Sequence, residues 1–285
     1  GEGVTEDNQE AIKWYRLAAE QGHMEAQFNL GRIYEVGEGV TADNQEAIKW
    51  YRFAADQGDI DAQFNLGWIY DEGEGVPENN REALKWYRLA AEQGSAHAQV
   101  NLGILLNEGE GGAAGKSEAM KWYLLAAEKG NPSAQVNIGI SYDFGDGVKE
   151  DNTKAIYWYQ QAASQGDAEG QYLLGTMYDS GEGVQEDRNE ALKWYLAAAE
   201  NGNNRALNRL GWIYRSGLGV DENSAIAEQY FLRAISNGHA NSSVDLGYLY
   251  TLESFIDGKT QNGIELLSEA ASGGSLEALT HLADY

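Results

Sequence analysis

The sequence predicts an all-α protein, built as a solenoid of helical hairpins that are each 36 residues long. Two observations predict this fold. Trp recurs at a constant interval of 36, at Trp14, Trp50, Trp86, Trp122, Trp158 and Trp194. One glycine column runs from Gly22 to Gly274 and another from Gly31 to Gly247, both with the same step. A fixed interval over the whole chain indicates repeats that stack because none buries its apolar surface alone.

The same interval divides the chain into units. We expect residues 1–285 to form a single solenoid domain of seven full repeats with a partial repeat at each end. The full repeats are 23–58, 59–94, 95–130, 131–166, 167–202, 203–238 and 239–274. Residues 1–22 supply the second helix of one partial repeat, and residues 275–285 supply the first helix of another. Because the chain starts inside a hairpin, we expect it to be a piece of a longer array.

The first helix of each unit, called helix A, is predicted from an apolar stripe. In unit 23–58, Ala26, Leu30, Ile33 and Tyr34 are spaced as residues on one face of a helix. The glycine-rich segment that follows Tyr34 breaks this pattern and predicts a loop. The stripe therefore faces the rest of the hairpin, and the loop turns the chain toward the second helix.

The second helix, called helix B, has start and stop signals of its own. Asp43 followed by Glu46 resembles a capping box, and Gly58 stands where glycine commonly closes a helix. Its apolar stripe is Ala47, Trp50, Tyr51, Ala54 and Ala55. The alanines and glycines allow close approach of helices, and we expect the Trp and Tyr columns to fill the space between layers. A ligand cage formed by these aromatic residues is the alternative.

The signature residues of unit 59–94 are similar to those of a known family. They are Ala62-Gln63, Leu66-Gly67, Tyr70, Gly73-Glu74-Gly75-Val76, Ala83, Trp86-Tyr87, Ala90-Ala91 and Gly94. The chain resembles the Sel1-like repeat family, a relative of the tetratricopeptide repeat, over essentially its whole length. The resemblance implies a right-handed superhelix and a non-enzymatic adaptor that binds other proteins.

The resemblance leaves several specific roles open, because fold does not determine function. The leading version is an exported bacterial adaptor at the envelope or in host contact, which implies a periplasmic or secreted location; a cytoplasmic location is also compatible. The alternative is an immunity protein that neutralises a secreted toxin. Alternatives of another class are a hydrolase, or a small-molecule or glycan binder that uses Trp68 and Trp212.

The composition excludes some functions. With 45 Asp and Glu against 20 Lys and Arg, the net charge of −25 argues against nucleic-acid binding, which needs basic surface. It favours a basic protein partner, although it suits solubility equally well. The absence of Cys excludes disulfides and cysteine-ligated metals. No apolar run approaches the ~18 residues of a membrane span, so we expect no membrane insertion.

Catalytic, cofactor and metal sites are not predicted. The four His lie in different phases of the repeat or many units apart. Gly115-Lys116-Ser117 lacks the glycine that a phosphate loop has five residues earlier. Carboxylates recur in the loop between helices A and B, at Glu38, Glu74, Glu110, Asp146 and Glu182. They are interpreted as solvated loop charge, with weak calcium or magnesium binding as the alternative.

A candidate partner site lies on the other face of helix A, which lines the concave groove in tetratricopeptide solenoids. One column of this face reads Asn29, Asn65, Asn101 and Asn137, beside Phe28, Phe64, Arg32 and Trp68. Helices stack ~8–10 Å apart and extended peptide advances ~3.3 Å per residue, so each Asn would meet every third residue of a bound strand. In the alternative interpretation, the Asn side chains bond backbone groups or neighbouring helices, and Phe28 and Phe64 pack between adjacent A helices.

A second candidate lies later on the same face. Arg205 and Arg209 are one helical turn apart, and Trp212 follows three residues on. Tyr172 and Tyr248 occupy aromatic positions of neighbouring units. Two arginines in an acidic chain predict a carboxylate ligand, such as a chain terminus. An ion pair between Arg209 and Asp245 is the alternative.

Overall fold

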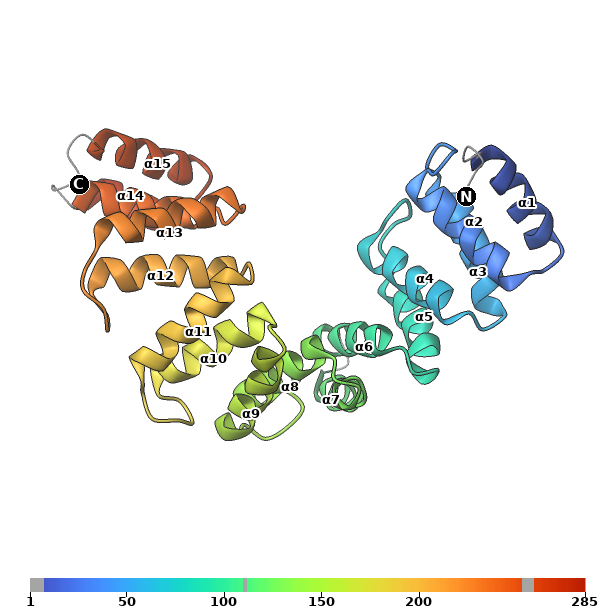
Figure 1. The fold of residues 1–285 in the computed structure, drawn as a ribbon, viewed down its shortest axis with the longest axis horizontal. Coiled ribbons are helices and arrows are strands. Elements are labelled where there is room, and N and C mark those ends of the chain that lie inside the picture. The colour runs from blue at the N-terminus through green and yellow to red at the C-terminus, as the bar shows by residue number, and fades with distance from the viewer. Residues whose placement is uncertain (1–7, 110–111, 253–258, 285) are drawn as a thin grey trace, which may run out of the picture. The chain divides into compact units, whose positions relative to one another are not determined.

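The computed structural model describes residues 8–109, 112–252 and 259–284 (Figure 1). In these ranges every regular element is a helix and there is no strand, which confirms the all-α prediction. The chain divides into two compact units, unit 1 (residues 1–150) and unit 2 (residues 151–285). This division leaves the expectation of a single solenoid domain a prediction.

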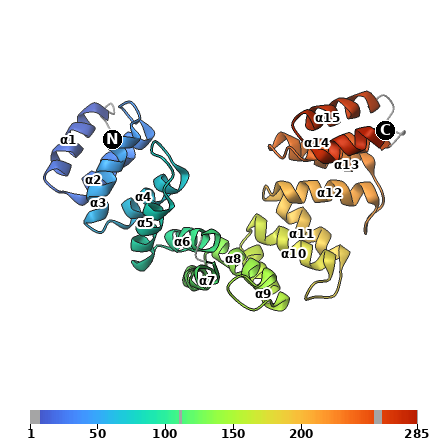
Figure 2. The same cartoon turned by 180° about the vertical axis from the view of Figure 1, so that it is seen from behind.

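Unit 1 contains the first eight described helices. They are α1 (Asn8–Glu20), α2 (Met24–Val36), α3 (Asn44–Asp56), α4 (Ile60–Glu72), α5 (Asn80–Glu92), α6 (Ala96–Glu108), α7 (Gly112–Glu128) and α8 (Pro132–Phe144). Within this unit each helix packs against the next one in the chain (Figure 2). The even-numbered helices are the predicted A helices and the odd-numbered ones are the predicted B helices.

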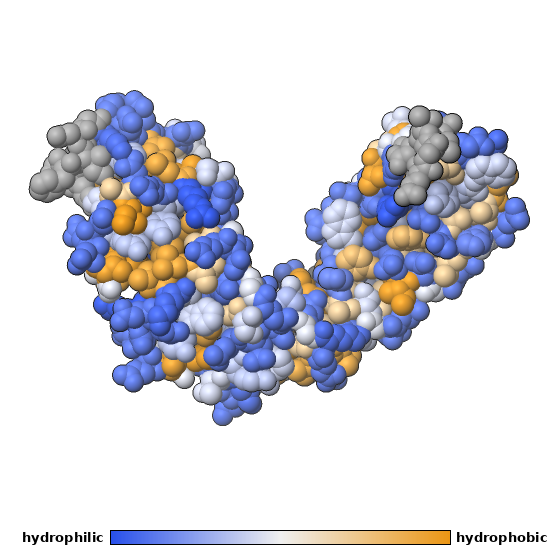
Figure 3. Space-filling model, viewed as in Figure 1, coloured by the Kyte–Doolittle hydropathy of each residue, from blue (hydrophilic) through white to orange (hydrophobic). Residues whose placement is uncertain are grey.

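Unit 2 continues the same alternation. Its described helices are α9 (Asn152–Ser164), α10 (Ala168–Ser180), α11 (Arg188–Glu200), α12 (Asn204–Ser216), α13 (Ser224–Ser236), α14 (Ser242–Leu252), α15 (Thr260–Ser272) and α16 (Leu276–Asp284). Consecutive helices again pack together within the unit. On the face drawn in Figure 3, hydrophobic residues lie in patches among hydrophilic ones in each unit.

Helix A forms where its stripe predicts it. In α2 the predicted stripe of Ala26, Leu30, Ile33 and Tyr34 is buried. Gly37 ends the helix in the left-handed conformation with φ of 73°, which glycine adopts without steric strain, and its N–H donates to the Ile33 carbonyl. This cap turns the chain into the loop that leads to helix B.

Helix B begins with half of the predicted capping box. The Asp43 carboxylate accepts hydrogen bonds from the backbone N–H groups of Gln45 and Glu46, at 3.0 and 3.1 Å. The Asp43 N–H donates instead to the Tyr34 carbonyl at 2.8 Å. The cap therefore ties the start of helix B to the end of helix A, while Gly58 closes helix B with φ of 97°.

The second glycine column exists because a tyrosine ring rests on it. A Cβ atom at Gly67 would lie 2.4 Å from Cδ1 of Tyr87, and one at Gly103 would lie 2.3 Å from Cε1 of Tyr123. Gly31, Gly175 and Gly211 meet an aromatic ring of their own hairpin in the same way. Each buried ring thus packs directly on the backbone of a glycine of its own hairpin. This contact allows the close approach of helices that the sequence predicts.

The Trp column is less buried than its regularity predicts. Trp50 and Trp86 lie in the core, whereas Trp122, Trp158 and Trp194 are half-buried. Trp14 is 59% exposed, so the core prediction is wrong for this residue. The reason is its place in the fold, because α1 packs against α2, whereas α3 packs against both α2 and α4.

Buried glutamines in helix A join neighbouring hairpins. The Gln63 amide donates to the Ala55 carbonyl near the end of α3, at 3.0 Å, and accepts from Gln93 of α5 at 2.8 Å. Gln27 and Gln171 make equivalent pairs of bonds in their own units. The Ala-Gln part of the repeat signature therefore has a structural role that the sequence pattern did not reveal.

Candidate functional site: the outer face of helix A

The helix-A face is the surface of the A helices that carries the predicted partner-binding residues. In unit 1 it consists of Phe28, Asn29 and Arg32 on α2, Phe64, Asn65 and Trp68 on α4, Val100, Asn101 and Ile104 on α6, and Val136, Asn137 and Ile140 on α8. Arg32 is exposed, the two valines are buried and the remaining residues are partly buried. Since α4 and α6 also contact each other, their residues form a continuous surface.

The phenylalanines of this face pack on the buried tyrosines. The ring centroids of Phe28 and Tyr51 are 5.7 Å apart, and those of Phe64 and Tyr87 are 5.8 Å apart. Both phenylalanines still reach the surface in part. The packing interpretation of this column therefore holds. Both rings pack on the tyrosine of helix B, and Phe64 also lies 6.1 Å from the ring of His97 on the adjacent A helix, α6.

The asparagine column bonds to the same tyrosines. Nδ2 of Asn101 donates to the Tyr87 hydroxyl at 3.1 Å, and that hydroxyl donates to Oδ2 of Asp71 at 3.2 Å. The Tyr87 hydroxyl thus links helix A of its own hairpin to helix A of the next. An Asn side chain offers an amide oxygen and a second N–H besides the bond made here.

The other members of the column differ in detail. Asn65 bonds the Tyr51 hydroxyl, which donates to Oε2 of Glu35 at 2.6 Å. Asn137 donates to the Ser133 carbonyl of its own helix at 2.9 Å. The structure therefore brings Asn65 and Asn101 into equivalent positions and leaves Asn137 outside that pattern.

Burial sets the protonation of these linked groups. It raises the pKa of the Tyr51 and Tyr87 hydroxyls above their ordinary value, and the nearby carboxylates raise it further. Burial also raises the pKa of Asp71, against the opposing effect of the Tyr87 hydrogen bond. The tyrosines therefore remain neutral donors, and the network on the helix-A face is fixed near neutral pH.

A hollow of about 140 Å³ opens on this face between α1 and α2. Asn29, Arg32 and Glu38 supply polar groups to its lining, and Tyr15 and Ile33 supply apolar surface. It places two of the predicted residues, Asn29 and Arg32, beside a space large enough for a small side chain.

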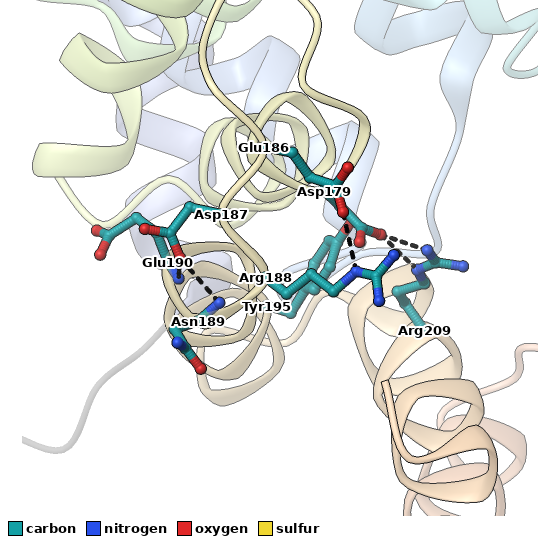
Figure 4. Close-up of polar contacts among 8 residues, drawn as sticks. All are labelled: Asp179, Glu186, Asp187, Arg188, Asn189, Glu190, Tyr195 and Arg209. Carbon is teal, nitrogen blue, oxygen red and sulfur yellow. Dashed lines mark hydrogen bonds and ion pairs between the residues drawn. The ribbon is translucent and has the colours of Figure 1, made fainter. Parts of the chain in front are cut away.

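In unit 2 the predicted arginine site is closed by ion pairs. Arg209 of α12 binds the Asp179 carboxylate of α10, with Nε to Oδ2 at 3.1 Å, and the Tyr195 hydroxyl donates to the same oxygen at 3.2 Å (Figure 4). The predicted partner Asp245 is wrong. Asp245 instead accepts a hydrogen bond from Asn208, the residue before Arg209, while Arg209 bonds the preceding A helix.

Arg205 is engaged in a similar way. It forms an ion pair with Glu169, and its guanidinium lies 4.5 Å from the centre of the Tyr172 ring. Tyr172 in turn packs on Tyr195. A carboxylate ligand would have to displace Glu169 or Asp179, so the two arginines act first as internal partners of the fold.

Trp212 and Tyr248 flank a third arginine that the sequence reasoning missed. The Arg215 guanidinium lies 4.8 Å from the Trp212 ring centre and 5.6 Å from that of Tyr248. Tyr248 also stacks on His281 at 3.6 Å. These aromatic residues are partly buried by their own neighbours, which leaves limited ring surface for a sugar.

The sequence model of the Sel1 repeat matches eight stretches of the chain. They are residues 1–23, 25–59, 60–95, 96–131, 132–167, 168–203, 204–239 and 241–275. The chain belongs to the Sel1 repeat family. No curated protein shows a significant match to it.

Solved structures of two other Sel1 proteins are similar to this Sel1 chain. One is a protective antigen present in uropathogenic Escherichia coli strains, with 35% identity, a TM-score of 0.78 and coverage of 99% of this chain. The chain spans 61% of that protein's length. The other is a Sel1 repeat protein from Oxalobacter formigenes, with 32% identity, a TM-score of 0.82 and coverage of 98% of this chain and 82% of the other.

A more distant structure shares the fold alone. The immunity protein Pa5087 from Pseudomonas aeruginosa is 20% identical, with a TM-score of 0.50 and coverage of 82% of this chain and 84% of the other. Sel1 repeats are commonly protein-interaction scaffolds and are generally non-catalytic. The family therefore supports protein interaction as the general activity.

The chemistry-bearing residues of this Sel1 chain are engaged within the fold. Over residues 8–109, 112–252 and 259–284, no group of three or more His, Asp or Glu is arranged to hold a metal ion. The loop residue Glu110 lies outside these ranges. Asp146 pairs with Lys116, and His23 caps α2. None of the described helices is long and apolar enough to span a bilayer.

Proposed function

We propose that this Sel1 chain is a non-enzymatic scaffold that binds an extended segment of a partner protein on the helix-A face of unit 1. The partner segment would run across α2, α4, α6 and α8, each of which would contribute residues from the same positions of its repeat. This proposal goes beyond the family's general role, because it names the face and the kind of segment that binds.

One observation carries the proposal. The side of the A helices opposite their buried stripe is not wholly polar, since Phe64, Trp68 and Ile104 occupy the helix-A face and are only partly buried. An ordinary surface helix of a globular protein carries charged and polar residues on that side. Partly exposed apolar residues in series, beside an Asn in each helix, suit a partner that brings both side chains and backbone polar groups.

The charge around this face bears on the partner. Residues 1–150 contain 26 Asp and Glu against 12 Lys and Arg. A basic segment would therefore be drawn toward unit 1 faster than an acidic one. Unit 2 contributes less to the proposed site, because Arg205 and Arg209 there already bind Glu169 and Asp179.

For the biological setting we propose an exported bacterial protein, in the periplasm or outside the cell. The similarity to a protective antigen of Escherichia coli supports this setting, since that relative is 35% identical over 99% of this chain. Binding of a secreted toxin would make the chain an immunity protein, and the experiment below distinguishes that partner from others by identifying it.

The experiment compares matched variants in affinity capture from bacterial lysate and culture medium. Trp68→Arg with Ile104→Arg alters the helix-A face. The control pair Leu232→Arg with Leu276→Arg adds the same charge at two exposed apolar residues of unit 2. We expect a partner that is retained by wild type and by the control pair and lost from the Trp68→Arg, Ile104→Arg variant. Photo-crosslinking from position 68 then maps the bound segment. Retention by the Trp68→Arg, Ile104→Arg variant, with helicity unchanged, would contradict the proposal.

A further inference from the structure

An apolar stripe lies on the opposite side of unit 1, on the B helices. Leu17, Phe53, Leu89 and Leu125 occupy the same position in α1, α3, α5 and α7, and we call them the helix-B stripe. Their exposed fractions are 42%, 46%, 37% and 42%. Surface apolar residues are ordinary when they are scattered, but here they recur at one position in four consecutive B helices.

The stripe is confined to unit 1. The same position in the B helices of unit 2 is Gln161, Ala197, Arg233 and Glu269. The fold of a hairpin therefore does not require a large apolar residue there, since α9, α13 and α15 form with Gln161, Arg233 and Glu269 at that position and α11 forms with Ala197. The apolar residues of unit 1 thus have a reason other than the packing of the hairpin.

The charge of unit 1 is distributed so that the stripe lies on its least acidic side. The helices α1, α3, α5 and α7 contain nine of the twelve Lys and Arg of residues 1–150, with eight Asp and Glu. The remaining residues of that range have three basic against 18 acidic side chains. Within unit 1, two copies of this acidic chain therefore repel each other least across this nearly neutral surface.

The charged rows beside the stripe are complementary to themselves. Four residues before each stripe residue stands a lysine, and three residues after it stands a carboxylate. The lysines are Lys13, Lys49, Lys85 and Lys121, and the carboxylates are Glu20, Asp56, Glu92 and Glu128. All eight residues are exposed, and Lys13, Lys49 and Lys85 each also pair with the Glu three residues earlier in their own helix.

We infer that the helix-B stripe of unit 1 is a self-association surface that pairs two copies of this chain. In one arrangement the two-fold axis runs along the direction in which the hairpins stack. This axis places the stripe of one copy on the stripe of the other, and the facing B helices are antiparallel. The lysine row of each copy then faces the carboxylate row of the other. A two-fold axis parallel to the B helices would instead place lysine on lysine, so the charges select one of the two arrangements.

The size of the surface fits weak, reversible pairing. The lysine and carboxylate rows are seven residues apart along each B helix, which is about 10 Å. With a helix about 10 Å across, three B helices give roughly 300 Å² per copy, or about 600 Å² in total, which is below the size of stable specific interfaces. We therefore expect a transient dimer with a dissociation constant well above micromolar.

Sedimentation velocity over a concentration series tests the pairing in the 285-residue chain. Wild type should convert from monomer to dimer as its concentration rises. Phe53→Glu with Leu89→Glu should weaken the dimer by about a hundredfold or more, because four apolar contacts per dimer are lost. The matched control is Gln161→Glu with Ala197→Glu in unit 2, which should leave the dimer unchanged.

Charge reversal tests the arrangement of the two copies. Lys49→Glu with Lys85→Glu should be monomeric, and so should Asp56→Lys with Glu92→Lys. An equimolar mixture of these two variants should dimerise, because each lysine row again faces a carboxylate row. A monomeric wild type at every concentration, a dimer that survives loss of the stripe, or a mixture that stays monomeric would each overturn the inference. Circular dichroism verifies that every variant is helical.

Discussion

Replacing Gly67 by Ala tests whether the glycine column is fixed by the tyrosine that rests on it. The new Cβ atom would lie 2.4, 2.6 and 2.9 Å from three ring atoms of Tyr87, well inside van der Waals contact. Tyr87 is fully buried, and its hydroxyl bonds Asp71 and Asn101. The ring therefore has no room to move without losing those bonds.

The magnitude follows from opposing contributions. Ala is favoured over Gly in a helix by about 1 kcal/mol. Overpacking a filled site costs about 1–3 kcal/mol, and displacing the Tyr87 hydroxyl from its hydrogen bonds costs about 1 kcal/mol more. We expect Gly67→Ala to lower the free energy of unfolding by about 1–3 kcal/mol, although the same change usually stabilises an exposed helix.

Urea unfolding followed by circular dichroism measures the effect, with midpoints and slopes compared because repeat arrays need not unfold in one step. The control is Tyr87→Ala, which removes the obstructing ring. In that background Gly67→Ala should become stabilising by about 1 kcal/mol, so the two changes are strongly coupled. A higher midpoint for Gly67→Ala in the wild-type background would refute the reasoning.

Three further predictions concern the polar contacts. Arg209→Ala should lower the free energy of unfolding by about 1–3 kcal/mol in urea melts, because it leaves the Asp179 carboxylate without its ion-pair partner and that side chain is only 16% exposed. The control Lys193→Ala removes an exposed pair with Glu190 and should leave the unfolding midpoint unchanged. Gln63→Ala should cost about 1–3 kcal/mol in the same assay, since it leaves the Ala55 carbonyl and the Gln93 amide without their partner, whereas loss of the exposed Gln45 should have little effect. Burial raises the pKa of Asp245, which also faces Asn208, Trp212, Glu277 and His239. Protonated Asp245 therefore contributes its full stabilisation below the unfolded-state pKa, and this stabilisation is lost as the pH rises through the native pKa. Wild type should gain stability relative to Asp245→Asn on acidification. A constant difference in unfolding free energy between pH 7 and pH 4 would contradict this prediction.

The hairpins were predictable because their signals are local. The spacing of Ala26, Leu30, Ile33 and Tyr34 and the break that follows them depend on residues within one turn or two of each other. Equivalent signals recur in every unit, so one correct interpretation extends along the chain. This explains why the boundaries of α2 and α3 agree with the expected unit.

The contacts between hairpins were less predictable. The repeat columns place Arg209 and Asp245 at the same position of adjacent units, 36 residues apart. The residue that Arg209 bonds is Asp179, which is 30 residues from it. Gln63 and Gln93, and likewise Arg88 and Glu118, are also 30 apart. Residues in one sequence column occupy equivalent positions, whereas residues in contact lie at different positions of adjacent units. Only the stacking geometry relates the two.

The exposure of a repeated residue also depends on neighbours that the column does not show. Trp14 and Trp86 have the same place in the repeat, yet one is 59% exposed and the other 2%. On the helix-A face most residues are partly exposed but Val100 and Val136 are buried, and the sequence did not show that the tyrosine hydroxyls bond Asn65 and Asn101. Whether these residues bind a partner remains a prediction for the capture experiment.

The buried glutamines have a consequence for how such arrays change length. Each Gln bonds a carbonyl eight residues before it, which belongs to the preceding hairpin. Deleting residues 59–94 would bring Gln99 into the position of Gln63, facing the Ala55 carbonyl. The junction would then contain the same donor and acceptor as before. Duplication of a hairpin preserves the junction in the same way, so genes of this kind can gain or lose 36 codons while every surviving boundary stays chemically matched.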